Sequence, residues 1–181
     1  QHQILILSQQ LQSIYHTTYE KERMKFKILT NNNSPLNMNF YESLIDNECT
    51  FPKTNQYEFD GHNFRSRFEM MAAQEIKSLQ IPYKYDCGIQ LSNRSLYPDF
   101  ALGFPEFNRC VLFELLGSMD NPKYVNDSVE KLRDYSNNRI LLESDCFLLC
   151  GTDRTMPCGP QIRIKLISII SALCSLYVIH L

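Results

Sequence analysis

Two short runs and the turn between them decide the fold of this chain: Leu96-Tyr-Pro-Asp-Phe-Ala-Leu102, Pro105-Glu-Phe-Asn108 and Cys110-Val-Leu-Phe-Glu-Leu-Leu116. The first and last runs are rich in residues that favour strands. The last run is apolar on both faces, as the strands in the middle of a sheet are. Residues 96–102 and 110–116 are therefore predicted to pair as an antiparallel hairpin.

The predicted hairpin sets two acids against each other. A turn centred on residues 105–108 pairs positions whose numbers sum to 213, and Asp99 and Glu114 meet that condition. Directly opposed side chains have Cβ atoms about 4.5–5.5 Å apart, so two carboxylates there repel each other unless a cation lies between them. Oxygen donors of this kind suit Mg²⁺. The alternative is a pair of ordinary surface acids at strand ends.

Two helices contribute further candidate residues. Asn63 is expected to cap a helix that runs to about residue 80, with Glu69 at the edge of its apolar stripe. Pro122 is expected to open a second helix to about residue 137. On it, Lys131 shares a face with Tyr124, Ser128 and Tyr135, which favours an inward position, although a lone helical lysine is more often a surface residue.

The remaining pattern predicts an α/β chain with a central mixed sheet flanked by helices. Residues 83–91 and 146–150 read as strands, residues 37–46 as a short helix, and residues from 161 onward as a closing helix. Residues 1–30 read as an amphipathic helix. We expect an N-terminal helical or linker segment over 1–60, which can belong to a longer protein, and one domain over 61–181.

The composition limits the kinds of binding partner and the cellular compartment that the chain suits. The formal net charge of −2 over 181 residues excludes a polyanion binder held by overall charge alone. Seven cysteines without a CxxC pair indicate reduced thiols in a reducing, cytoplasmic compartment. The apolar stretch over residues 166–181 is shorter than the usual membrane span, so we expect a helix packed on the core and no membrane partner.

Several motifs in order resemble the PD-(D/E)xK nuclease superfamily, the restriction-endonuclease-like fold. Within that superfamily, the motifs are similar to those of a group of bacterial and phage-associated domains. The motifs cover about residues 64–157 and stand here as Arg65-Ser-Arg-Phe-Glu69, Ile81-Pro-Tyr-Lys-Tyr-Asp86, Tyr97-Pro-Asp-Phe100 and Glu114-Leu-Leu-Gly-Ser-Met-Asp-Asn-Pro-Lys-Tyr124.

The resemblance implies a restriction-endonuclease-like core and an enzyme that hydrolyses phosphodiester bonds of DNA or RNA to 5′-phosphate and 3′-hydroxyl ends. Its metal is Mg²⁺, which Mn²⁺ can replace, and its partner is a nucleic acid, with DNA preferred. The ligands implied are Asp99, Glu114 and Glu69, and Lys131 completes the catalytic set. Because the overall charge is slightly acidic, a homodimer or an upstream domain is expected to supply part of the contact with the nucleic acid.

Substrate contacts are expected from basic and aromatic side chains around these acids. Arg65, Arg67, Lys84 and Arg94 are predicted to meet the phosphate backbone. Tyr124 is a candidate for stacking on bases, although packing in the core or at its rim is the favoured role of this tyrosine.

The chain departs from the superfamily pattern at two positions. Leu116 stands where the usual lysine follows the second acid by two residues, and in the narrower group that lysine lies on the next helix, as Lys131 does here. Leu115 replaces the histidine that commonly follows the acid. Two other readings stay open: a catalytically degenerate nuclease-fold module that binds nucleic acid or protein, and an unrelated α+β interaction domain whose carboxylates are coincidental.

Overall fold

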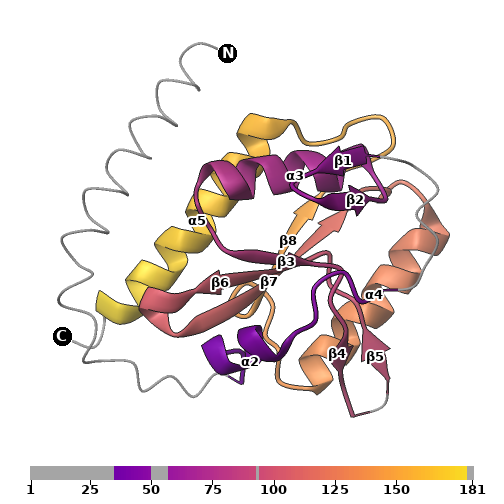
Figure 1. Cartoon of the computed structure of the whole chain (residues 1–181). Helices are drawn as coiled ribbons and strands as arrows, with labels where there is room; N and C mark the ends of the chain where they lie inside the picture. The colour runs from indigo at the N-terminus through magenta and orange to yellow at the C-terminus, as the bar shows by residue number, and fades with distance from the viewer. Residues whose placement is uncertain (1–34, 50–56, 93, 179–181) are drawn as a thin grey trace.

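A computed structural model of the chain describes residues 35–49, 57–92 and 94–178. In these residues the centre is a four-stranded sheet in the order β3-β6-β7-β8 (Figure 1). Neighbouring strands are antiparallel except β7 and β8, which are parallel. The strands are β3 Tyr83–Tyr85, β6 Phe100–Phe104, β7 Arg109–Leu116 and β8 Cys146–Cys150. The predicted mixed sheet flanked by helices is confirmed; the helix predicted over residues 1–30 lies outside the described residues.

The hairpin of β6 and β7 has the predicted register. Its first pair is Phe100 with Phe113 and its last is Phe104 with Arg109, so every pair sums to 213. A single 3₁₀ turn, η2 (Pro105–Phe107), closes it. Since the ladder begins at residue 100, it ends one pair before the two acids.

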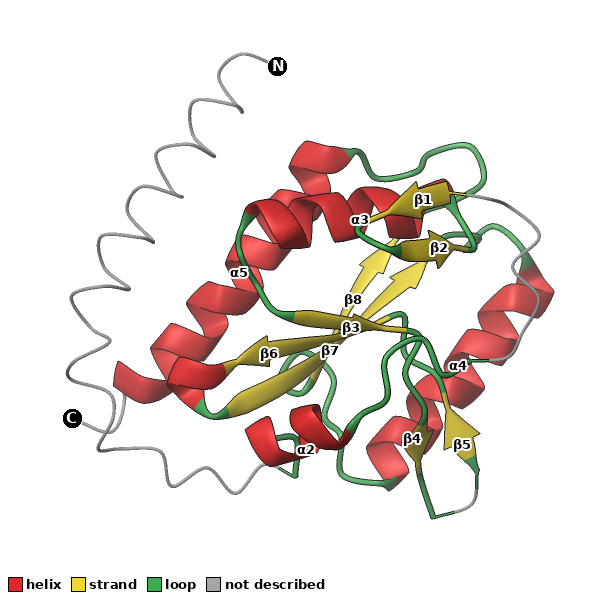
Figure 2. Cartoon of the chain, viewed as in Figure 1, coloured by secondary structure: helices red, strands yellow, loops and turns green. Residues whose placement is uncertain are grey.

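The two predicted strands next to this hairpin are each broken in two. The run over 83–91 divides into β3 and β4 (Ile89–Gln90), and the run from 96 divides into β5 (Ser95–Leu96) and β6. β4 and β5 pair with each other and stand apart from the central sheet, beside α4 (Figure 2). Asp86 has a positive φ of 54° directly after β3, and Pro98 has no N–H to donate to a ladder. The first run is therefore interrupted at Asp86, and the second is interrupted directly before Asp99.

The helix that carries Glu69 begins later than predicted. Asn63 lies in β2 (His62–Phe64), which pairs with β1 (Tyr57–Phe59) in a small hairpin that the sequence pattern did not reveal. The cap of α3 (Arg67–Ser78) is Ser66, whose hydroxyl accepts the Glu69 backbone N–H at 3.1 Å. Glu69 therefore lies in the first turn of α3, where a negative charge is favoured by the helix dipole.

The other helices follow the sequence closely. α2 is Met38–Ser43, α4 is Pro122–Asn137 and α5 is Gly159–Val178. Pro122 is the first residue of α4, and the Asn121 side chain before it accepts the Lys123 N–H at 3.0 Å. Among the described helices, none combines the length and the apolar character needed to cross a bilayer.

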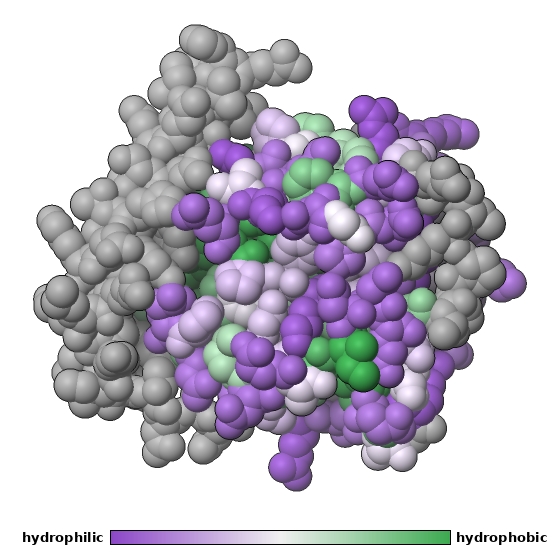
Figure 3. Space-filling model, in the orientation of Figure 1, coloured by the Kyte–Doolittle hydropathy of each residue, from purple (hydrophilic) through white to green (hydrophobic). Residues whose placement is uncertain are grey.

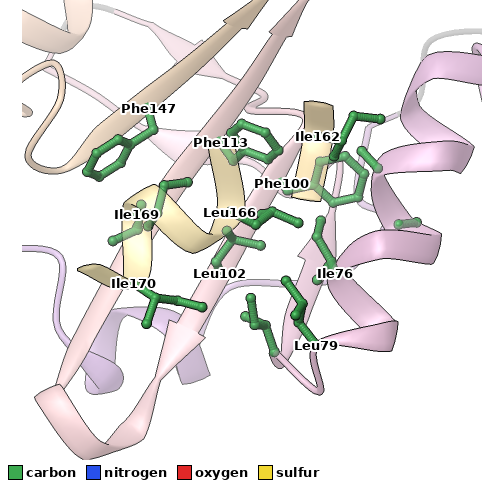
Figure 4. Close-up of a cluster of buried hydrophobic side chains, with 14 of the residues drawn as sticks. Ile76, Leu79, Phe100, Leu102, Phe113, Phe147, Ile162, Leu166, Ile169 and Ile170 are labelled. Atoms are coloured by element: carbon green, nitrogen blue, oxygen red, sulfur yellow. The ribbon is translucent and has the colours of Figure 1, made fainter. Parts of the chain in front are cut away.

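Side chains of β6 and β7 alternate between two apolar clusters on opposite faces of the sheet. Phe100, Leu102 and Phe113 face α3 and α5, while Ala101 and Leu112 face α2 and α4. Figure 4 shows the first cluster, in which strand residues meet side chains of α3 and α5: Ile76, Leu79, Phe100, Leu102, Phe113, Phe147, Ile162, Leu166, Ile169 and Ile170.

The second face includes residues before position 61. Leu36, Tyr41 and Leu44 are buried in its cluster, and a Cβ added at Gly103 would lie 3.1 Å from the Tyr41 ring. The Lys84 ammonium donates to the carbonyls of residues 41, 42 and 44 at 2.8, 3.2 and 2.7 Å, which caps the end of α2. The packed unit thus extends into the segment predicted to be separate from it.

The face drawn in Figure 3 is dominated by hydrophilic residues, with apolar side chains in small groups. All seven cysteines are free thiols, and four of them are buried.

Candidate active site

Four predicted residues meet at one end of the central sheet. Asp99 directly precedes β6 and Glu114 lies near the end of β7, so the antiparallel register brings them to the same end. Glu69 approaches from the first turn of α3, and Lys131 approaches from α4. The sheet and two helices therefore hold one cluster of three acids and one lysine.

Glu114 is the most deeply buried member, with only 1% of the residue exposed. The Tyr135 hydroxyl donates to its Oε1 at 2.6 Å, and the Lys131 ammonium lies 2.8 Å from its carboxylate oxygens. Burial raises the pKa of Glu114 to about 7; the Lys131 charge opposes the rise and the nearby Asp99 carboxylate adds to it. Near neutral pH this carboxyl group is thus poised between its two protonation states.

Lys131 faces inward, as its helical position predicted. Its Nζ donates to the Tyr97 carbonyl at 2.7 Å as well as to Glu114. Burial alone would lower the pKa of Lys131, but the carboxylates of Glu114 and Asp99 outweigh that effect and raise it. The side chain is 24% exposed, and its charged ammonium joins the turn before β6 to the end of β7.

Asp99 reaches across the end of the hairpin. Its Oδ2 accepts the Leu115 backbone N–H at 2.7 Å, and its Oδ1 accepts from Arg65 Nη2 at 3.1 Å. The two oxygens therefore have different partners, one in the backbone of β7 and one on a side chain that is 28% exposed.

Glu69 is held by the loop before its own helix and by β3. Its Oε2 accepts from the Tyr85 hydroxyl at 2.6 Å and from the Arg65 backbone N–H at 3.0 Å. Burial raises the pKa of Glu69 and the charge of Asp99 adds to the rise, while Arg65 and Tyr85 oppose it. Two of the clustered acids thus bind a proton more readily than a free glutamate.

Asp86 is a fourth acid of the site that the sequence did not single out. It is fully buried, its Oδ1 lies 3.2 Å from Arg65 Nη1, and its backbone N–H donates to the Asp99 carbonyl at 3.1 Å. The signal available in the sequence was its place at the end of the motif Ile81-Pro-Tyr-Lys-Tyr-Asp86. Tyr85 and Tyr135, whose hydroxyls donate to Glu69 and Glu114, were likewise not predicted as site residues.

The predicted substrate-binding residues fall into two groups. Arg65 lies within the acid cluster, and Tyr124 lies beside it, with its hydroxyl oxygen 3.3 Å from the Gly117 N and 3.4 Å from the Leu115 carbonyl oxygen. Arg67 is exposed on the first turn of α3.

The other two predicted contacts are directed elsewhere. Lys84 caps α2 on the opposite side of β3 from Tyr85, because neighbouring residues of a strand point to opposite faces. Arg94 forms an ion pair with Asp134 on α4. The structure does not bring either side chain to the acids, and the strand break after residue 96 explains why Arg94 lies on the separate β4–β5 ribbon.

The clustered acids offer oxygen ligands and an excess of negative charge, and both suit a hard divalent cation. Carboxylate oxygens are the ligands that Mg²⁺ prefers. Four acids, Glu69, Asp86, Asp99 and Glu114, are partnered by two cations, Arg65 and Lys131, which leaves a formal balance of two negative charges.

The acids do not converge on one point as they stand. Within the described residues, no three His, Cys, Asp or Glu side chains are grouped so that they could hold a metal ion. Their oxygens instead turn toward Arg65, Lys131 and two tyrosine hydroxyls. Binding a cation would therefore require at least one internal cation to release a carboxylate.

Comparisons of the chain with protein-family models, with curated protein sequences and with solved structures gave no match.

Proposed function

We propose that the protein is a nuclease of the PD-(D/E)xK type, which uses Mg²⁺ or Mn²⁺ to hydrolyse phosphodiester bonds of DNA or RNA. The products are 5′-phosphate and 3′-hydroxyl ends. One observation carries the proposal: the β6–β7 register brings Asp99 and Glu114 to the same end of the sheet, where the Lys131 ammonium lies 2.8 Å from Glu114. The mixed sheet flanked by helices is compatible with the restriction-endonuclease-like fold.

The charge balance supports a divalent cation as the missing partner. Buried carboxylates are costly unless a positive group neutralises them, and the raised pKa values of Glu69 and Glu114 indicate that the internal cations do so incompletely. Asp99 and Glu114 would hold the cation, with Glu69 beside them. When bound, it would lower the pKa of a coordinated water and stabilise negative charge on the phosphate.

The side chains around the acids have distinct roles in this proposal. Lys131 favours the ionised form of Glu114 and orients it, and its ammonium can offset negative charge on the phosphate. Arg65 contacts the acids directly, and Arg67 is exposed on the first turn of α3, so both can meet a phosphate from that side. Tyr124 lies beside the end of β7, where a base or sugar of the substrate can pack on its ring.

A second candidate function is a degenerate nuclease-fold module that binds nucleic acid or a protein without cutting. The observation that favours it is that Arg65, Lys131 and tyrosine hydroxyls already engage Glu69, Asp99 and Glu114. Such a module would keep a salt-sensitive affinity for nucleic acid and would not depend on the charge of Asp99.

Cleavage of end-labelled single- and double-stranded DNA and RNA, in Mg²⁺, Mn²⁺ or EDTA, separates the two functions. The nuclease should cut only with metal, leave 5′-phosphates, and lose activity in Asp99→Asn. The matched control is Glu106→Gln, which changes a carboxylate in the turn at the other end of the hairpin. Binding without cutting in wild type, unchanged in Asp99→Asn, would support the degenerate module instead.

A further inference from the structure

One guanidinium occupies the middle of the acid cluster. Arg65 Nη2 lies 3.1 Å from Asp99 Oδ1, and Nη1 lies 3.2 Å from Asp86 Oδ1. Nε lies 3.6 Å from Glu69 Oε1. A single monovalent cation therefore joins acids from three places in the fold: the first turn of α3, the turn after β3 and the residue before β6.

The oxygen of Asp99 that Arg65 holds is also the one that a metal would need. Oδ2 of Asp99 already accepts the Leu115 N–H at 2.7 Å, which leaves Oδ1 as the oxygen turned into the cluster. Mg²⁺ requires oxygen atoms at about 2.0–2.1 Å in octahedral geometry, whereas a guanidinium spreads its acceptors around a planar fork. Two positive groups on one oxygen would repel each other, so the metal and Arg65 would compete for it.

The contact between Arg65 and the acids can be broken by a movement of the arginine side chain. The Arg65 side chain is 28% exposed, so its guanidinium can turn into water. A divalent cation that replaced it would have to compensate the acids that Arg65 leaves, including the fully buried Asp86. The contrasting pair is Arg109 and Asp145, in which each side chain is only 6% exposed and Arg109 Nη2 lies 2.6 Å from the carboxylate. Arg109 has the character of a fixed structural cation, and Arg65 that of an exchangeable one.

We propose that Arg65 is an internal competitor of the divalent cation: it neutralises the acids in the metal-free protein and is displaced toward solvent when the metal binds. This inference rests on the proposed function, because it concerns the same metal site. Once displaced, the guanidinium would face solvent beside the acids, where its planar fork suits a phosphate group. Metal binding and the exposure of a phosphate-binding group are then one coupled event.

Calorimetric titration of the whole chain with Mn²⁺ tests the competition. Arg65→Gln should bind Mn²⁺ at least about tenfold more tightly than wild type, as expected when one charge-assisted hydrogen bond no longer has to be broken. Arg67→Gln removes the same charge two residues away, at an exposed position. Its Mn²⁺ affinity should stay within about threefold of wild type, because exposed charges are screened.

A measurement on the wild-type protein does not depend on how the variants fold. In ¹⁵N-labelled protein, Mg²⁺ should shift the assigned Nε–H resonance of Arg65 and leave that of Arg109 unchanged. Equal Mn²⁺ affinity in wild type and Arg65→Gln, with a static Arg65 resonance, would overturn the competition and leave the nuclease proposal standing. Absence of Mn²⁺ binding to every form would overturn both.

Discussion

In the absence of metal, the variant Glu114→Gln should become increasingly more stable than wild type as the pH rises. Burial raises the pKa of Glu114 from its ordinary 4.5 to about 7 in the folded state. Below pH 4.5 this group is protonated in both the folded and the unfolded chain, so it imposes no cost. Between pH 4.5 and 7 the unfolded chain loses the proton first, which lowers the free energy of unfolding of wild type.

The size of the effect follows from that difference in pKa. Each pH unit between the two pKa values is worth about 1.4 kcal/mol, so wild type should lose about 3 kcal/mol relative to Glu114→Gln over this pH interval. Glutamine keeps the shape of the side chain and remains neutral throughout.

Urea unfolding in EDTA at pH 5 and pH 8 measures this difference, because the free energy of unfolding extrapolates linearly to water. Glu106→Gln, in the turn at the other end of the hairpin, is the control and should show no such pH-dependent gain. The reasoning is refuted if the difference between Glu114→Gln and wild type is the same at both pH values. It is also refuted if the variant becomes relatively less stable as the pH rises, since the Lys131 ion pair would then outweigh the cost of burial.

Three further substitutions test the surroundings of the site. Lys131→Met should lower the cleavage rate at pH 7 by at least about a hundredfold. Lys123→Met, at the exposed start of the same helix, is the control and should leave the rate within about twofold of wild type. Equal rates in the two variants would show that Lys131 does not belong to the site. Tyr135→Phe deletes a hydroxyl 2.6 Å from the Glu114 carboxylate, so it should cost about 1.5–3 kcal/mol of unfolding free energy at pH 8 and less at pH 5. Gly103→Ala places a methyl group 3.1 Å from the ring of the α2 tyrosine and should cost about 1–3 kcal/mol in urea unfolding; an unchanged stability would show that α2 does not pack there.

The sequence was sufficient where local pattern and tertiary packing agree. The β6–β7 register follows from the length of one turn, and the burial of both strands makes a slip by one residue costly because it would exchange their two faces. The first helical residue of α4, Pro122, and the inward face that carries Lys131 follow from helix geometry.

The sequence was insufficient where a single backbone feature redirects the chain. Asp86 adopts a positive φ, so an apolar run that reads as one strand becomes β3 and β4. The small β1–β2 hairpin took Asn63 away from its predicted capping role. The bridging position of Arg65 depends on contacts among three elements far apart in sequence, which no local pattern encodes.

Divalent-cation binding at the end of the sheet is the property on which the proposed function depends, and equilibrium titration with Mn²⁺ measures it without any assumption about substrate. Wild type and Glu106→Gln should bind Mn²⁺ alike, and Asp99→Asn should bind it at least about tenfold more weakly, because it removes one charged ligand. The same Mn²⁺ affinity in all three proteins would contradict the assignment of the metal to Asp99 and Glu114.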